Sequence, residues 1–399
     1  MKRRLKRILS ILLVLTVLSL SSAAANAQSL PQRIYAASIS EGYEKVPDSI
    51  DAKAALLMDV ETGKILMGKD IDKKLYPASV TNIMTMLLTM EAIEQKKISF
   101  DDRVTVSNLA AGKGGSQIWL KENETMTVHE LLKATAVYSA NDACTALGEH
   151  IAGSDSAFTE LLNSKAKELG MKNTHFDNCT GLDDETTTHL TTARDVAIMA
   201  RELLKHEKII EYTTIWMDSL RNGETQLVNT NKLVRYYKGA TGLKTGTTSK
   251  AGCCVAASAR REETHLLAVV LGSSSSKERF SAARQMLDWG FANYKTIALQ
   301  IDKKLITQVR VINGVEDSLT PEISKSFVMT VKKGDEKKIE TKIELPLDVK
   351  APVEKNQKLG DVVLMIGKNE IGRYSLTSPR SVRSLNFKDI LFRLIKSIA

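Results

Sequence analysis

The sequence predicts a mixed α/β domain followed by a small all-β domain, with an export segment in front of both. Strand-like runs lie at both ends of the first domain, and amphipathic helical patterns lie between them. From residue 296 to 379, short runs rich in valine, isoleucine and lysine alternate and are separated by glycine- and asparagine-containing turns. The chain has 399 residues, enough for two domains at about 150 residues each.

Residues 1–27 have the organisation of a secretory signal peptide. An apolar run from Ile8 to Leu20 follows a basic start and precedes the small-x-small sequence Ala25-Asn26-Ala27. This run is shorter than the roughly 20 residues that span a bilayer comfortably. We therefore expect cleavage after residue 27 and an exported protein, with an uncleaved membrane anchor as the alternative.

Charge and cysteine content exclude several classes of function. Residues 1–27 hold five of the basic residues, so the formal net charge of the remainder is +4 instead of +9. This mild excess gives no case for nucleic-acid binding. The four cysteines lack metal-ligand spacing and are too few for a disulfide framework, which indicates buried free thiols (Cys144, Cys179, Cys253 and Cys254).

The first domain, residues 50–295, follows a polar linker over residues 28–49. Two short strands flank the turn at Thr62-Gly63, and a helix begins at Ser79. Residues 126–153 predict two helices broken near Ser139, the first with a capping box from Thr127 to Glu130. Further helices are expected over residues 154–170, 191–206 and 277–294. Residues 241–248, 251–260 and 264–273 predict an antiparallel meander.

The C-terminal residues 380–399 predict an amphipathic helix. One helical face would carry Phe387, Leu391, Leu394, Ile395 and Ile398, and the basic residues Arg383, Lys388, Arg393 and Lys396 lie largely off that face. Such a helix can lie in a membrane interface. Docking of the helix on its own protein is the alternative, and its terminal position in an exported chain favours the membrane.

Three short motifs carry the chemistry. A serine opens the helix after Tyr76-Pro77-Ala78, a polar triplet interrupts the helices near residue 140, and a lysine-threonine-glycine sequence lies on a strand expected at a sheet edge. Each motif alone is weak evidence. A serine followed three residues later by a lysine, the usual form of the first motif, occurs at residues 164–167 in a helix interior and at residues 274–277 in a polar turn. The motifs are Ser79-Val80-Thr81-Asn82, Ser139-Ala140-Asn141 and Lys244-Thr245-Gly246.

Order and flanking residues strengthen the interpretation. The segments "YPASVTNIMT", "YSANDA", "NTHFDNCTGLDDE", "HLTTARDVA" and "GATGLKTGTTSKAGCCVAASA" resemble those of D-alanyl-D-alanine carboxypeptidases, the low-molecular-mass penicillin-binding proteins of cell-wall maturation. The resemblance covers nearly the whole chain after residue 27. It implies a penicillin-binding/β-lactamase-like domain, in which an antiparallel sheet has helices on both faces and a helical subdomain.

The resemblance also implies a substrate and an acyl-enzyme route. The substrate would be a peptidoglycan stem peptide ending in D-Ala-D-Ala, and β-lactams would be covalent inhibitors. Ser79 would attack the penultimate carbonyl, release D-Ala and form an acyl-enzyme that water resolves. The backbone N–H groups of Ser79 and Thr247 would stabilise the oxyanion. No metal or cofactor is implied.

The remaining motif residues have implied roles in binding and proton transfer. Lys244 and Thr245, with Gly246 beside them, would hold the terminal carboxylate of the substrate. Ser139 would relay a proton to the leaving amine, and Asn141 would hold the acyl amide. These roles imply action outside the cytoplasm, at the cell wall or the outer face of the membrane.

Asn82 departs from the family pattern, which has lysine at this position. A lysine at i+3 shares a helix face with Ser79 and can accept its proton. Asparagine cannot accept a proton at any useful pH. Three interpretations follow: a pseudoenzyme that binds without cleaving, slow activity through Lys244, Ser139 and water, or a strain-level mutation or sequencing error.

Two neighbouring elements and three other protein classes complete the prediction. Residues 114–117 would form either the cleft rim or a plain turn, and His189 is expected to be structural instead of a general base.

A β-lactamase would usually need neither the β-domain nor the tail, and no deacylating glutamate motif is evident. A wall-binding scaffold would bind stem peptides without releasing D-Ala, and a purely structural exported protein would not bind them.

Overall fold

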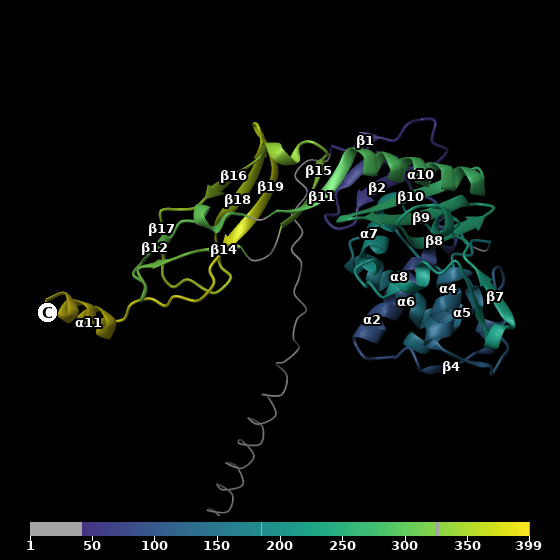
Figure 1. The fold of residues 1–399 in the computed structure, drawn as a ribbon. Coiled ribbons are helices and arrows are strands. Elements are labelled where there is room, and N and C mark those ends of the chain that lie inside the picture. Colours follow the sequence, from purple (N-terminus) through teal and green to yellow (C-terminus); the bar gives the residue numbers. More distant parts are fainter. Residues whose placement is uncertain (1–41, 185, 300, 324–326, 399) are drawn as a thin grey trace, which may run out of the picture. The chain divides into compact units, whose positions relative to one another are not determined.

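The computed structural model describes residues 42–184, 186–299, 301–323 and 327–398 (Figure 1). The predicted signal peptide and most of the linker therefore lie outside the described residues. The first domain is built on a six-stranded sheet of order β1-β3-β2-β10-β9-β8. Its strands are β1 (Glu44–Lys45), β2 (Ala54–Asp59), β3 (Ile65–Lys69), β8 (Ala240–Thr248), β9 (Gly252–Arg261) and β10 (Thr264–Ser273).

The predicted antiparallel meander is confirmed, because β8 pairs with β9 and β9 with β10 in antiparallel register. One pair differs from the expectation of an antiparallel sheet: the short edge strand β1 runs parallel to β3. The strand that carries Lys244 is the opposite edge of the sheet, so one side of β8 is available to a bound chain.

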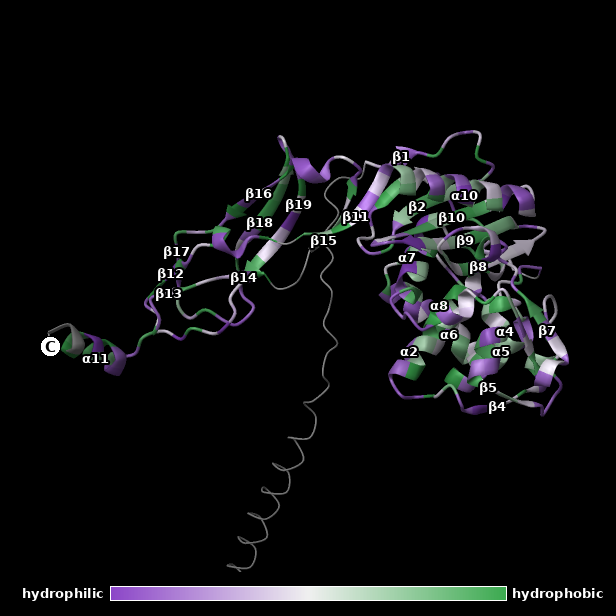
Figure 2. Cartoon of the chain, viewed as in Figure 1, coloured by the Kyte–Doolittle hydropathy of each residue, from purple (hydrophilic) through white to green (hydrophobic). Residues whose placement is uncertain are grey.

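Helices cover both faces of this sheet, because its central strands are apolar on both sides (Figures 1 and 2). On β2, Leu56 belongs to the core on the side of α7 (Ala193–Leu203), and Leu57 belongs to the core on the side of α10 (Ser276–Asn293). Helices α2 (Asn82–Glu94), α4 (Val128–Val137), α5 (Asn141–Ala152), α6 (Asp155–Glu168) and α8 (Ile209–Thr213) extend the first of these cores into a helical subdomain.

Capping residues set the helix boundaries. Thr127 and Glu130 form the predicted capping box at the start of α4, and Ser154, Thr192 and Ser275 cap α6, α7 and α10. Helix α7 is shorter than the predicted 191–206, since Thr192 caps its start and Leu203 is its last helical residue. Small elements that sequence patterns did not predict complete the domain: α3 (Asn108–Ala111), α9 (Leu233–Tyr236) and the pairs β4 (Arg103–Thr105) with β5 (Thr125–Thr127) and β6 (Met217–Leu220) with β7 (Thr225–Val228).

The C-terminal domain is all-β, as predicted. Its core gathers alternating side chains such as Val362, Leu364 and Leu376. Its strands are β11 (Tyr294–Leu299), β12 (Val309–Ile312), β13 (Ser318–Leu319), β14 (Glu322–Ile323), β15 (Phe327–Lys332), β16 (Ile339–Glu344), β17 (Asp348–Lys350), β18 (Lys358–Ile366) and β19 (Asn369–Thr377).

The predicted C-terminal helix is α11 (Phe387–Ile398). Both hydrophobic and hydrophilic residues colour it in Figure 2. Within the described parts of the chain, no helix combines the length and the apolar character needed to cross a membrane.

Candidate active site

Ser79 lies in a single 3₁₀ turn, η1 (Ala78–Thr81), that leads directly into α2. Two glycines bring other segments against its backbone. A Cβ atom at Gly246 would come within 2.8 Å of the Ser79 nitrogen, and one at Gly181 within 1.9 Å of the Ala78 carbonyl oxygen. Strand β8 and the loop around residue 181 therefore hold the half-buried serine from two sides, and neither approach tolerates a side chain.

Asn82 is fully buried one helical turn from Ser79. Its Nδ2 atom donates to the carbonyl oxygens of Cys179 (3.2 Å) and Thr180 (3.5 Å) and to Cys144 Sγ (3.3 Å). Its Oδ1 atom accepts a hydrogen bond from Ser139 Oγ at 3.2 Å. The carboxamide therefore fills the place of the expected lysine and satisfies its own donors and acceptor, but it offers no basic group.

Ser139 links Asn82 to Lys244. Ser139 interrupts the helices with a φ of +64°, which places its side chain between α2 and the sheet edge. Lys244 Nζ donates to Ser139 Oγ at 2.6 Å and to the Thr245 carbonyl oxygen at 2.9 Å. The predicted residues Asn82, Ser139 and Lys244 thus form one continuous hydrogen-bond chain.

The pKa of Lys244 is lowered from its usual 10.5 to about 7, mainly by burial; Cys144 opposes this change and the neighbouring Arg279 adds to it. The side chain is only 1% exposed, so the ammonium form loses most of its hydration. Near neutral pH, this amine exists in both protonation states. It can therefore bind an anion as a cation or accept a proton as a base.

Asn141 closes the second motif against the loop over residues 114–117. Its Nδ2 atom donates to the Gly114 carbonyl oxygen at 2.8 Å, and its backbone nitrogen donates to the Ser116 carbonyl oxygen at 2.7 Å. Its Oδ1 atom is buried without a hydrogen-bond partner among the described residues. Of the two predictions for residues 114–117, the cleft rim is the one that these contacts favour.

Arg279 is a site residue that the sequence did not reveal. Its guanidinium, 7% exposed on α10, donates through Nη1 to the Gly246 carbonyl oxygen (2.9 Å) and to Thr247 Oγ1 (2.8 Å). It adds a positive charge behind the strand motif, while Thr245 Oγ1 donates to Thr230 Oγ1 at 2.7 Å. An arginine within an amphipathic helix carries no sequence signal for this role.

His189 is structural, as expected. It is fully buried, its Nε2 atom lies 2.9 Å from Thr81 Oγ1, and its Nδ1 atom accepts a hydrogen bond from the Asp177 nitrogen. Burial lowers its pKa to about 4, so it stays neutral and braces the turn that carries Ser79.

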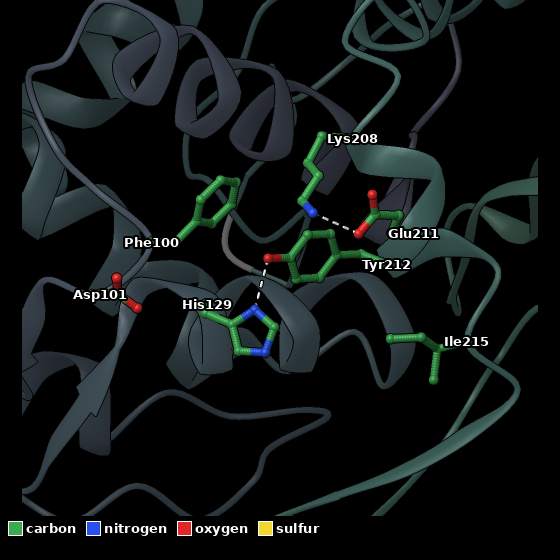
Figure 3. A pocket seen from close by; sticks show the side chains of 7 residues that line it. All are labelled: Phe100, Asp101, His129, Lys208, Glu211, Tyr212 and Ile215. Atoms are coloured by element: carbon green, nitrogen blue, oxygen red, sulfur yellow. Dashed lines mark hydrogen bonds and ion pairs between the residues drawn. The ribbon is translucent and has the colours of Figure 1, made fainter.

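A cavity of about 410 Å³ lies elsewhere in the helical subdomain (Figure 3). Its polar contacts are internal: His129 Nδ1 lies 2.7 Å from Tyr212 Oη, and Lys208 pairs with Glu211 at 2.7 Å. None of the predicted site residues lines it. Its residues are Phe100, Asp101, His129, Lys208, Glu211, Tyr212 and Ile215.

The described cysteines are free thiols. Three are buried and Cys253 is half-buried. The Cys144 thiol and the Cys179 backbone carbonyl both accept hydrogen bonds from Asn82, so these two residues lie beside the site.

The geometry can support acyl transfer to a serine. A helix-start serine lies against the edge strand that also carries the buried Lys244 amine, and this amine contacts the Ser139 hydroxyl. Asn141 adds an amide with an open acceptor. A substrate chain that pairs with the free side of β8 would bring its carbonyl to the backbone N–H groups near Ser79 and Thr247.

Comparison with known proteins agrees with this geometry. Residues 41–275 match the family model described as D-alanyl-D-alanine carboxypeptidase, and residues 294–384 match that of the penicillin-binding protein 5 C-terminal domain. The D-alanyl-D-alanine carboxypeptidase DacF of Bacillus subtilis is 38% identical over 347 residues, covering 86% of this chain and 89% of the relative. DacA of Escherichia coli is 30% identical and covers 87% of each chain.

Solved structures show the same fold. Penicillin-binding protein 5 of Haemophilus influenzae matches with a TM-score of 0.78 and 31% identity, over 85% of this chain and 99% of that one. Penicillin-binding protein D2 of Listeria monocytogenes in an ampicillin-bound form matches with a TM-score of 0.57 and 29% identity, over 61% of this chain and 99% of that one.

Fold and comparisons together define a low-molecular-mass penicillin-binding protein. Within that class, the chain belongs to the D-alanyl-D-alanine carboxypeptidase family of serine hydrolases, which confirms the family predicted from its motifs.

Proposed function

We propose that this protein removes the terminal D-Ala from peptidoglycan stem peptides through an acyl-enzyme on Ser79, at a rate that Asn82 lowers. The observation that carries the proposal is the hydrogen-bond chain from Asn82 through Ser139 to Lys244. This chain keeps a titratable amine, that of Lys244, beside Ser139, although position 82, one helical turn from Ser79, has no amine.

The acylation step needs an acceptor for the proton of Ser79 Oγ. As the oxygen bonds to the substrate carbonyl carbon, the proton passes to Ser139 and from there to the neutral form of Lys244. Collapse of the tetrahedral intermediate breaks the peptide bond, and the leaving D-Ala amine takes a proton back from the same relay. Water then attacks the acyl ester and regenerates Ser79.

The lower rate follows from assigning two tasks to one amine. Lys244 must be a cation to hold the terminal carboxylate, with Thr245, and must be neutral to accept the proton. In the family pattern a second lysine, at position 82, would share these tasks. General-base assistance is worth about 10²–10⁴-fold, so we expect acylation to be slower by at least about 10²-fold than with lysine at position 82.

A purified sample tests the proposal by release of D-Ala from a pentapeptide, with Asn82→Lys and Ser79→Ala as comparison variants. Slow release by the natural chain, faster release by Asn82→Lys and none by Ser79→Ala are expected. Stem-peptide binding with no release by the natural chain would instead assign it the role of a peptidoglycan- and penicillin-binding pseudoenzyme.

We further propose that the protein acts outside the cytoplasm with α11 lying in the membrane interface. Phe387, Phe392 and Ile395 are 78%, 71% and 60% exposed, an apolar surface that favours burial in lipid. Sedimentation with vesicles that contain anionic lipid tests this, and removal of residues 387–399 is expected to abolish binding. Equal binding after the truncation would refute it.

A further inference from the structure

Trp119 lies at the tip of the loop that closes the second motif, and a buried carboxylate clamps both of its neighbours. The backbone nitrogens of Ile118 and Leu120 donate to Asp142 Oδ2 at 3.1 and 3.0 Å. Asp142 is fully buried and follows Asn141 directly on α5. The clamp fixes the backbone on each side of the tryptophan.

The conformation of Trp119 presents its ring to solvent. Its φ of +59° is one that bulky L-residues rarely adopt. Arg221, paired with Glu124 at 2.7 Å, donates to the Ile118 carbonyl oxygen at 2.9 Å and holds the same turn from the other side. The indole is 74% exposed, more than any other large apolar side chain among the described residues of the first domain.

This loop is continuous with the proposed substrate site. Residues Gly114 and Ser116 accept hydrogen bonds from the side chain and backbone of Asn141. The loop that carries Trp119 is therefore attached to Asn141 and to the next residue of α5, Asp142. Lys121 and Glu122, which follow Trp119 by two and three residues, are exposed, and Glu122 accepts a hydrogen bond from Asn108 at 3.1 Å.

We propose that Trp119 is a stacking platform for a sugar ring of the glycan strand to which the stem peptide is attached. This inference rests on the proposed function, because it takes the polymer as the substrate. A flat aromatic face packs on the C–H face of a pyranose, and flanking carboxylate and amide groups bind its hydroxyl and acetamido groups. One exposed indole is too small an apolar area for a stable protein interface.

Glycan strands freed of stem peptides by an amidase provide a direct probe. Binding to the full-length protein is measured by calorimetry and by the change in tryptophan fluorescence. We expect Trp119→Ala to weaken binding by about tenfold and Trp119→Phe to retain part of it. Tyr236→Ala, which removes an aromatic side chain that is 63% exposed on α9, is the matched control and should bind as the natural chain does.

Labelling of Ser79 by fluorescent penicillin, measured on the same variants, separates this inference from the proposed function. Labelling without glycan binding, or equal glycan binding by the natural chain and Trp119→Ala, would overturn the platform while leaving the proposed function intact. Trp119-dependent glycan binding in a protein that is never labelled would support the platform and reject the acyl-enzyme. Trp119-dependent binding of free stem peptide alone would assign the surface to peptide and also overturn the inference.

Discussion

Restoring lysine at position 82 is the most informative perturbation of this site. The Asn82 Nδ2 atom already faces the carbonyl oxygens of Cys179 and Thr180, and Ser139 Oγ lies 3.2 Å from its Oδ1 atom. These are three acceptors, the number that an ammonium group can satisfy. An ammonium group at position 82 could use these acceptors once the surrounding side chains make room for the longer lysine, because Asn82 is fully buried.

The magnitude follows from charge and proton transfer. Two amines that both contact Ser139 would lie within roughly 6 Å of each other, and their repulsion is about 3 kcal/mol at an effective dielectric constant of 20. One of them is therefore neutral near pH 7 and can take the Ser79 proton while the other binds the carboxylate. We expect penicillin labelling of Asn82→Lys to be at least about 10²-fold faster, or about 3 kcal/mol in activation free energy.

The assay is the second-order rate of labelling by a fluorescent penicillin at neutral pH. Asn82→Met is the matched control, because methionine has nearly the length of lysine and no amine. Equal rates for Asn82→Lys and the natural chain would refute the reasoning, and so would an equal acceleration by Asn82→Met.

Three further predictions concern the residues around Ser79. Burial lowers the pKa of Lys244 to about 7, so between about pH 7 and pH 10 the unfolded chain holds a proton that the folded chain has lost. The free energy of unfolding should therefore rise over this range. In urea titrations Lys244→Met should remove this rise, and the same variant should abolish penicillin labelling. Burial lowers the pKa of His189 to about 4, so the free energy of unfolding should fall as pH drops from about 6.5 to about 4. His189→Gln should lessen that loss and should change the penicillin-labelling rate at pH 7 by no more than about twofold. Gly181→Ala should slow labelling by about tenfold or more, because the added Cβ would lie 1.9 Å from the Ala78 carbonyl oxygen. Gly170→Ala is the control: this glycine also has a positive φ but has open space around it, so labelling should not slow.

Much of the fold could be predicted from the sequence because its signals are local. The apolar run of β2, the capping box of α4 and the break at Ser139 each depend on a few consecutive residues. The parallel pairing of β1 with β3 could not be predicted, because a two-residue edge strand has no periodic pattern.

The candidate site divides in the same way. Ser79, Ser139 and Lys244 could be predicted from motif order, but Arg279 and Asp142 could not. Arg279 contacts Gly246 and Thr247, which are distant from it in the sequence. Asp142 holds the backbone of the Trp119 loop, which has no recognisable sequence motif. Their roles depend on tertiary packing, which a single sequence does not display.

The central claim is that Ser79 still forms an acyl-enzyme although Asn82 replaces the expected lysine. Mass spectrometry of the intact protein after prolonged incubation with benzylpenicillin tests this claim most directly, followed by digestion to locate the adduct. One penicilloyl group on the peptide that contains Ser79, absent in Ser79→Ala, is the predicted result. An unmodified natural chain, or an adduct that persists in Ser79→Ala, would contradict the account.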